Sequence, residues 1–135
     1  MIQKVSILNK EQVKIGKTKE DKKENPYHQG DFVWLNFSPS EGNEMRGKHP
    51  AVIVSTDNYN RAGNYVIVCP ITSHGSDAPI YFKLVNYETV HGRVNCSQIH
   101  SFDQSRIIDK TGERMSAADF TFVHQLLSLA LMVDY

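Results

Sequence analysis

The residues best suited to chemistry lie close together, in the segment GNEMRGKHP. It holds a carboxylate, two cations and an imidazole: Glu44, Arg46, Lys48 and His49. Arginine binds phosphate as a two-pronged donor, lysine acts as a point charge, and histidine carries a proton near neutral pH. The combination favours a site for a phosphate-bearing substrate, with Glu44 orienting the cations by ion pairing.

Two apolar segments flank this polar stretch and are expected to hold it in place. The segment before it reads DFVWLNF (residues 31–37), and the segment after it reads PAVIVS (residues 50–55). Short runs rich in β-branched and aromatic residues, bounded by Gly, Asn, Asp and Pro, are typical of β-strands. A loop between two strands is a common place for ligand-binding or catalytic groups, because the strands fix its ends.

Three more short apolar runs follow at close spacing, which predicts a compact antiparallel sheet or barrel. They read YVIVCPI (65–71), IYFKLV (80–85) and GRVNCSQI (92–99). The runs VIV and VIVC are apolar throughout, so their strands should be central and covered on both faces. Near the C-terminus the spacing becomes helical from Phe120 to Met132, after a capping box that runs from Ser116 to Asp119.

The composition indicates one small domain without a strong overall charge. The chain has 135 residues, and 15 Lys and Arg balance 15 Asp and Glu, so a polyanion site must be local. Residues 1–28 differ, with seven lysines against four acidic residues. We interpret 1–28 as a polar, Lys-rich extension and 29–135 as the folded domain. The lysines could touch RNA, although a solvated tail also explains them.

The cysteines and histidines show no metal-binding spacing. Cys69 and Cys96 each lie within an apolar run, which favours free, buried thiols over a disulfide. Neither CxxC nor HxxxH occurs, so we expect no metal and no cofactor. There is no secretory signal, and no apolar run is long enough to cross a membrane. We therefore expect a cytoplasmic protein that has no membrane partner.

Five motifs occur in order along the chain: GDFVWLNFSPSEG, GNEMRGKHP, AVIVSTDNYN, VIVCPITS and HGRVNCSQIHSFD. With them, the chain resembles the MazF/PemK/Kid toxins of bacterial toxin–antitoxin systems, from about Gly30 to Tyr135. GNEMRGKHP corresponds to the family's Gly-x-Glu-x-x-Gly-x-Arg-Pro segment. The resemblance implies a mainly β (α+β) fold, a small SH3-like antiparallel barrel with a C-terminal helix, as in MazF, PemK and CcdB.

Two positions depart from the family pattern. The family's main catalytic Arg, before the proline, is His49 here, and the acidic residue that often precedes its Gln is Ser97. The family's Thr and Gln are kept, as Thr72 and Gln98. Histidine is a better proton carrier than arginine near neutral pH, so we predict that His49 and Thr72 are catalytic. The alternative is that His49 is a loop residue adapted to Pro50, with no chemical role.

Four polar residues are predicted to bind the substrate: Arg46, Lys48, Ser73 and Gln98. Arg46 or Lys48 would supply the fixed positive charge that the family's Arg provides, and Ser73 would be a second hydroxyl donor. Gln98 would contact a base edge or a phosphate, unless it is a satisfied amide at a strand end.

Three other residues each have two possible roles. His74 could be a second acid–base partner. Arg93 either lines the same groove or lies in an exposed hairpin. Trp34 is interpreted as a core aromatic, with base stacking as the alternative.

The resemblance implies a toxin that is a sequence-selective endoribonuclease acting on single-stranded mRNA, which would inhibit translation and growth. The ribose 2′-OH would attack the adjacent phosphorus without a metal ion. This reaction needs a base, an acid and donors for the charge that develops on the phosphorane. The alternative is a non-catalytic or CcdB-like toxin that inhibits DNA gyrase, or that only binds antitoxin or RNA.

The resemblance also implies protein partners. Family members are symmetric homodimers, and the apolar surplus of residues 126–132 fits a subunit interface. A cognate antitoxin would wrap the dimer and occupy the RNA groove, and the antitoxin complex would bind DNA.

Overall fold

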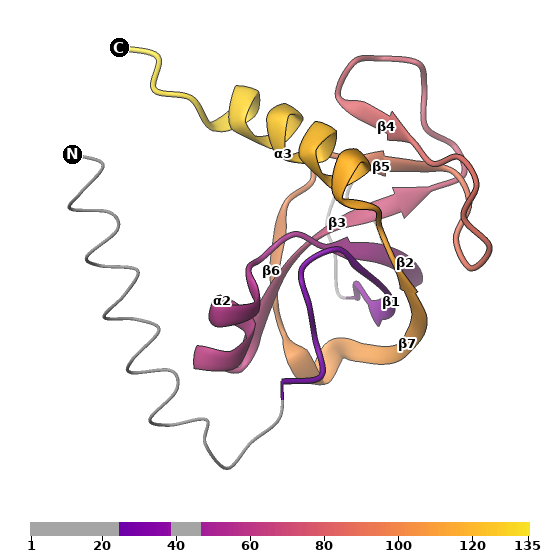
Figure 1. Cartoon of the computed structure of the whole chain (residues 1–135), viewed down its shortest axis with the longest axis vertical. Helices are drawn as coiled ribbons and strands as arrows, with labels where there is room; N and C mark the ends of the chain where they lie inside the picture. Colours follow the sequence, from indigo (N-terminus) through magenta and orange to yellow (C-terminus); the bar gives the residue numbers. More distant parts are fainter. Residues whose placement is uncertain (1–24, 39–46) are drawn as a thin grey trace.

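In the described part of the chain, seven antiparallel strands form one sheet, and a longer helix follows near the C-terminus (Figure 1). The computed structural model describes residues 25–38 and 47–135. The elements are β1 (Asp31–Asn36), β2 (Lys48–Ile53), α2 (Asp57–Ala62), β3 (Tyr65–Thr72), β4 (Tyr81–Lys83), β5 (Arg93–Asn95), β6 (His100–Asp103), the 3-10 helix η1 (Gln104–Arg106), β7 (Ile107–Arg114) and α3 (Ala117–Leu131). The predicted antiparallel, mainly β architecture with a C-terminal helix is confirmed.

The sheet is centred on β3, as its apolar sequence predicted. The strand order is β4-β5-β3-β2-β1-β7, and β6 pairs with β3 beside β5. The prediction of a closed barrel was wrong, because no ladder joins β4 to β7 in the described part of the chain. The backbone links the two sides of the sheet instead. The 3-10 helix η1 connects β6, which pairs with β3, to β7, which pairs with β1.

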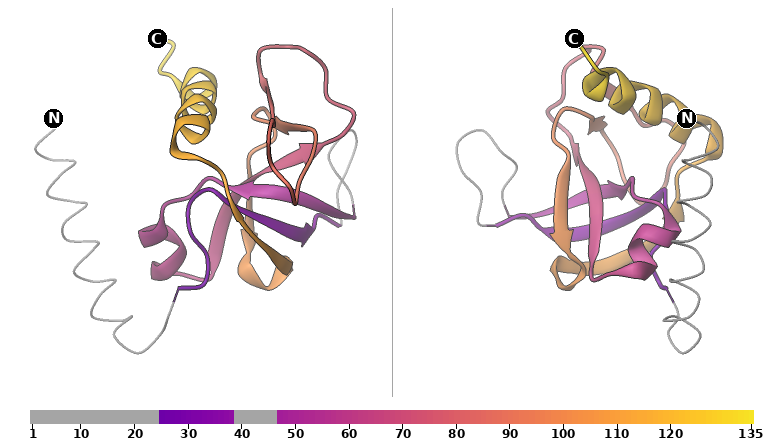
Figure 2. Two further views of the ribbon diagram at one scale, coloured as in Figure 1. Left: turned by 45° about the vertical axis from the view of Figure 1, so that its right-hand side comes forward. Right: turned by 90° about the vertical axis from the view of Figure 1, so that its left-hand side faces the viewer.

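The two faces of the sheet bury separate apolar clusters. Consecutive residues of a strand point to opposite faces, so Phe32 joins one cluster and Val33 joins the other. The first cluster contains Val123 of α3 together with both cysteines, and the second lies between β1, β2 and β3. In both views of Figure 2, α3 lies over one end of the sheet and α2 lies at the other end.

The predicted helix forms, and much of its apolar surface is exposed. Ser116 caps it by accepting a hydrogen bond from the Asp119 backbone N–H at 3.2 Å, as the capping box predicted. Among its apolar residues, Val123 is fully buried and Leu126 and Leu127 are half-buried. The last turn, including Leu131, remains exposed. Within the described ranges, no helix is long and apolar enough to cross a membrane.

Candidate functional site

Gly92 sets the first contact of the candidate site, the pairing of Thr72 with Arg93. Thr72 ends β3 and Arg93 begins β5, and the two residues are partners in the antiparallel ladder. A Cβ atom at Gly92 would lie 2.3 Å from the carbonyl oxygen of Thr72, and its φ of +116° is one that other residues rarely adopt. Glycine at this position therefore lets β5 approach β3 closely enough to pair.

His49 lies at the same end of the sheet and on the same face as Thr72. The β2–β3 register pairs Ala51 with Pro70. His49 stands two residues before Ala51 and Thr72 two residues after Pro70, so side-chain alternation puts both on the face of that pair. The His49 ring packs edge to face against Phe37, with ring centroids 6.3 Å apart. Phe37 is fully buried and so provides a rigid wall for the imidazole.

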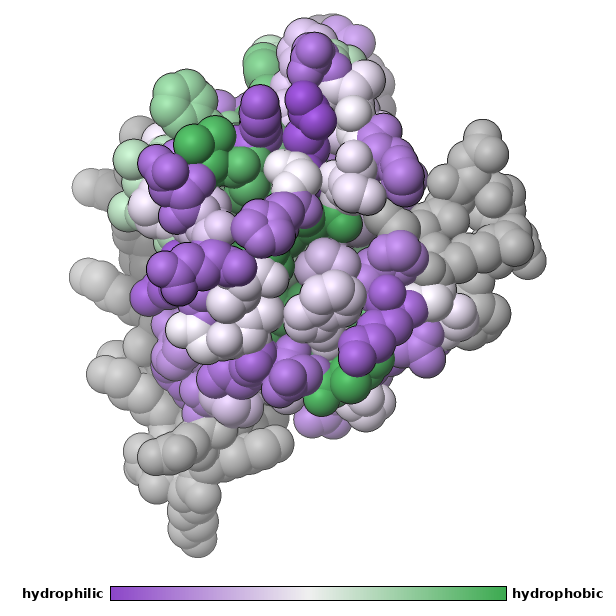
Figure 3. Space-filling model, turned by 90° about the vertical axis from the view of Figure 1, so that its right-hand side faces the viewer, coloured by the Kyte–Doolittle hydropathy of each residue, from purple (hydrophilic) through white to green (hydrophobic). Residues whose placement is uncertain are grey.

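The same face continues across β5 and β4. Lys83 pairs with Arg93, and Arg93 pairs with Thr72, so the row runs from a lysine through an arginine to a hydroxyl and then towards the imidazole of His49. Figure 3 shows the side of the molecule where β3 ends, and hydrophilic side chains cover most of it, with smaller hydrophobic patches between them. We call Lys83, Arg93, Thr72 and His49 the polar row.

Lys48 does not join His49 in this row. It precedes His49 in β2, so its side chain lies on the other face, where the ammonium group sits 5.6 Å from the centre of the Trp34 ring. Trp34 is half-buried and belongs to neither apolar cluster, so its assignment to the core was wrong. Arg46 and Glu44 lie outside the described residues, so their positions do not enter the site.

The other predicted residues lie around the end of β3 and the turn after β5. The Thr72 hydroxyl oxygen accepts a hydrogen bond from the His74 backbone N–H at 3.1 Å. Ser73 and His74 are exposed in the loop that follows. Gln98 is half-buried, and its backbone N–H donates to the carbonyl of Asn95 at 3.3 Å. Thr72 thus lies on the face that carries His49, Ser73 follows it in the loop, and Gln98 belongs to the turn that leads from β5 to β6.

Sequence reasoning left Arg93 undecided and missed Lys83. Their alternation in GRVN and YFK was the available signal, because it puts them on the same face once β4, β5 and β3 are paired. The segments themselves are three-residue strands, too short for their pairing partners to be read from a hydrophobic pattern.

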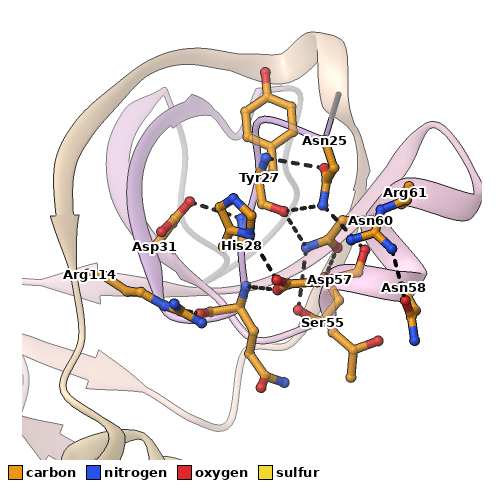
Figure 4. Close-up of polar contacts among 12 residues, drawn as sticks. Asn25, Tyr27, His28, Asp31, Ser55, Asp57, Asn58, Asn60, Arg61 and Arg114 are labelled. Atoms are coloured by element: carbon orange, nitrogen blue, oxygen red, sulfur yellow. Dashed lines mark hydrogen bonds and ion pairs between the residues drawn. The ribbon is translucent and has the colours of Figure 1, made fainter. Parts of the chain in front are cut away.

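A second polar cluster has a role in folding rather than in chemistry (Figure 4). It fastens the segment before β1 to α2. The Asp57 carboxylate accepts from the Gln29 backbone N–H at 2.8 Å, and His28 Nδ1 lies 2.8 Å from its other oxygen. The side-chain amide of Asn60, which is buried, donates to the carbonyl of Tyr27 at 3.2 Å. These hydrogen bonds hold residues 27–29 against Asp57 and Asn60 of α2, and we call this cluster the clasp.

Comparison with known proteins shows to which protein family this chain belongs. Residues 28–131 match the PemK-like, MazF-like toxins of type II toxin–antitoxin systems. The chain belongs to this family. The endoribonuclease toxin ChpB of Escherichia coli K12 is 30% identical to this MazF-like toxin over 121 residues, which cover 83% of the chain and 98% of ChpB. The endoribonuclease toxin MazF of the same strain is 32% identical over 59 residues, 44% of the chain and 53% of MazF. The chain therefore spans about half the length of that second relative.

Solved structures of MazF share the fold of this MazF-like toxin. The crystal structure of MazF (Form-I) from Deinococcus radiodurans superposes with a TM-score of 0.72 at 30% identity, covering 79% of this chain and 97% of that one. In a MazE–MazF structure (Form-II) from the same organism, the matching chain has a TM-score of 0.68 at 28% identity, with 82% and 100% coverage. Members of the family have thus been seen both alone and with an antitoxin.

Proposed function

We propose that this toxin is an endoribonuclease that cleaves single-stranded mRNA at selected sequences without a metal ion, and so inhibits translation and growth. The observation that carries the proposal is the shared position of His49 and Thr72, a titratable imidazole and a hydroxyl on one face and at one end of the sheet. The names of the relatives, endoribonuclease MazF, ChpB and PemK, support the same activity.

The proposed reaction is an internal transfer at phosphorus. His49 takes the proton of the ribose 2′-OH as the 2′-oxygen bonds to phosphorus, and the bond from phosphorus to the 5′-oxygen breaks. The leaving 5′-oxygen takes a proton from a water molecule and His49 returns its proton to the solvent, which gives a 5′-OH and a 2′,3′-cyclic phosphate. The hydroxyl of Thr72 donates to a non-bridging oxygen, where negative charge develops. A single strand is needed, since a duplex holds the 2′-OH out of line with the leaving oxygen.

The remaining predicted residues would bind the substrate around this centre. Ser73 follows Thr72 in an exposed loop and would donate to the same phosphate or the next one. Two cations would contact phosphates further along the RNA. They are Arg46, which precedes β2 in the sequence, and Lys48, which begins β2. Gln98 would contact a base edge, which is the contact that could give sequence selectivity.

We also propose that the toxin is a cytoplasmic homodimer inhibited by a cognate antitoxin. The MazE–MazF structure from Deinococcus radiodurans supports an antitoxin partner, because it matches this chain over 82% of its length. Exposed apolar side chains on α3 and at its C-cap support a subunit interface: Phe122, Leu129, Leu131 and Met132 are each at least 61% exposed.

A cleavage assay in EDTA tests the activity. A long single-stranded RNA is incubated with the purified toxin, and the ends of the fragments are mapped. Cleavage at a short, recurring sequence with 5′-OH ends is the expected result, and a His49→Ala protein is the matched control. Intact RNA, together with inhibition of gyrase supercoiling, would favour the CcdB-like alternative and overturn the proposal.

A further inference from the structure

Arg93 carries a counter-ion that is surrounded by solvent. Its Nη2 atom lies 2.8 Å from Oδ1 of Asp77. The arginine side chain is only 22% exposed, whereas the aspartate side chain is 95% exposed. An ion pair with one fully accessible partner gains little free energy, because water and salt compete for both charges. Asp77 can therefore leave the guanidinium at low cost when another anion arrives.

The arginine side chain starts beside Thr72 and packs against the loop that follows β3. The loop after β3 crosses over it at Gly75, where a Cβ atom would lie 3.1 Å from Cδ of Arg93 and 3.1 Å from Cδ1 of Tyr81. The carbonyl of Gly75 accepts from Nη1 of Arg93 at 3.5 Å. Directly opposed residues in a ladder have Cβ atoms about 5 Å apart, so the stem of Arg93 begins next to the Thr72 hydroxyl. The loop after β3 thus contacts both the stem of Arg93 and its guanidinium.

Lys83 extends the positive charge along the same face. It is the ladder partner of Arg93 on β4 and is exposed. A phosphate that accepts from Thr72 would have Arg93 as its neighbour, and the next phosphate of an extended strand would meet Lys83. Arginine suits the inner position, because its planar fork binds phosphate through two parallel hydrogen bonds.

We propose that Arg93 binds a backbone phosphate of the RNA beside the cleaved bond, with Lys83 on the following phosphate, and that Asp77 is a displaceable counter-ion that competes with the RNA. This inference rests on the proposed function and extends it to two residues outside the predicted set. Arg93 would provide a fixed positive charge on the face of the sheet that carries His49. Lys48 does not provide this charge, because its side chain lies on the opposite face.

Binding of an uncleavable RNA tests the inference apart from catalysis. The probe is a single-stranded RNA that contains the mapped cleavage motif with 2′-O-methyl riboses, and its Kd is measured over a series of KCl concentrations. Arg93→Gln should weaken binding roughly tenfold or more. It should also reduce the slope of log Kd against log salt by about 0.7, the loss of one phosphate contact on a single strand.

Asp77→Asn gives the sharper result, because removing the competitor should tighten binding roughly two- to fivefold. In the Arg93→Gln background, Asp77→Asn should change the Kd no more than Asp134→Asn does. Arg61→Gln on α2 and Asp134→Asn near the C-terminus are the matched controls for charge, and a thermal melt checks the fold of each variant. If Arg93→Gln does not fold, Arg93→Lys and Asp77→Asn still carry the test.

Each outcome has a definite meaning. Unchanged affinity and salt slope in Arg93→Gln, or an Asp77→Asn protein that behaves like Asp134→Asn, would overturn this inference while leaving RNA cleavage in place. A wild-type toxin that neither binds nor cuts RNA would overturn the proposed function as well.

Discussion

Lys48 and His49 are consecutive in β2, yet their side chains serve opposite faces of the sheet. The Lys48 ammonium lies over the Trp34 ring, and the His49 imidazole packs against the edge of Phe37. The alternation of the strand thus separates two groups that the sequence sets side by side. It follows that the two residues should respond very differently to substitution.

The first prediction concerns this pair. His49→Ala should lose about 10²–10⁴-fold in cleavage rate, the usual contribution of general acid–base catalysis. Lys48→Ala should lose at most about fivefold, the size expected for an exposed charge. Both rates are measured on the same RNA at saturating concentration, and antitoxin binding confirms that each variant is folded.

The identity of the group at position 49 can be tested further by His49→Arg. If His49 transfers a proton, His49→Arg should cleave slowly, because a guanidinium stays protonated and cannot accept a proton near neutral pH. A His49→Arg protein as active as wild type would show that the position needs charge instead. Full activity in His49→Ala would end the assignment and direct attention to His74.

The second prediction concerns the Thr72 hydroxyl. Its oxygen accepts from the His74 backbone N–H, a bond that uses a lone pair and leaves the O–H as a donor for the phosphate. Thr72→Ala should lose roughly tenfold to a hundredfold, the range for a hydrogen bond to a charged group, which is less than the loss for His49→Ala. Thr72→Ser keeps the hydroxyl and should retain most activity. Equal losses in the two variants would indicate a packing role for Thr72.

The strands that build the core could be predicted from the sequence, because each carries its own signal. The runs that became β1, β2 and β3 are apolar and β-branched, and the helix has a capping residue at Ser116. Strand β7 (Ile107–Arg114) was not predicted, since its residues are largely polar and exposed at the edge of the sheet. Its pairing with β1 is decided by tertiary contacts that no local pattern encodes.

The candidate site was predictable only in part, for the same reason. The family motifs pointed to His49 and Thr72 one at a time. Their common face follows from the register between β2 and β3, and the place of Arg93 follows from the close approach that Gly92 permits. These are long-range relationships. The prediction that Trp34 belongs to the core was wrong. A large aromatic residue in a strand is usually buried by other apolar residues, whereas Trp34 is half-buried and packs beneath the side chain of Lys48.

The third prediction concerns the two cysteines. As expected from the sequence, both are free and buried. Burial raises the pKa of the Cys96 thiol to about 11 and the pKa of the Cys69 thiol still further. Because the thiolate is the reactive form, the native protein should resist alkylation at neutral pH, and both thiols should react after unfolding without reductant. Mass spectrometry counts the adducts. Two adducts on the native protein would contradict the burial, and none on the unfolded protein would reveal a disulfide.

The fourth prediction is a pH dependence of stability that comes from Asp57. Burial raises the pKa of this carboxyl, but the hydrogen bonds from Gln29 and His28 and the nearby positive charges outweigh it, so the net pKa is lowered. The unfolded chain therefore takes up this proton at a higher pH than the folded chain. The resulting stability is present above the unfolded pKa and is lost as the pH falls through the folded pKa.

Asp57→Asn isolates this contribution. Urea midpoints at neutral pH and at about pH 3 should show that wild type loses more stability on acidification than Asp57→Asn does. Asp134→Asn, which removes an exposed carboxylate near the C-terminus, should behave like wild type. An identical acid loss in Asp57→Asn and wild type would show that the clasp does not depend on the charge of Asp57.

The last prediction is the oligomeric state. In α3, Leu129 is 66% exposed and Leu131 is 70% exposed, and Phe122 stacks on Phe82 with one face open. Large apolar side chains exposed along one helix favour an interface, so the toxin should sediment as a dimer at tens of micromolar, which corresponds to a dimerisation free energy of roughly −6 kcal/mol or stronger. Leu129→Glu should shift the protein towards the monomer, because the dimer would have to bury an unpaired charge. Asn58→Asp on α2, which is exposed and lies at the other end of the sheet (Figure 2), is the control for the added charge and should leave the dimer intact. A wild-type protein that sediments as a monomer at this concentration would refute the dimer, and a dimer unaffected by Leu129→Glu would move the interface away from α3.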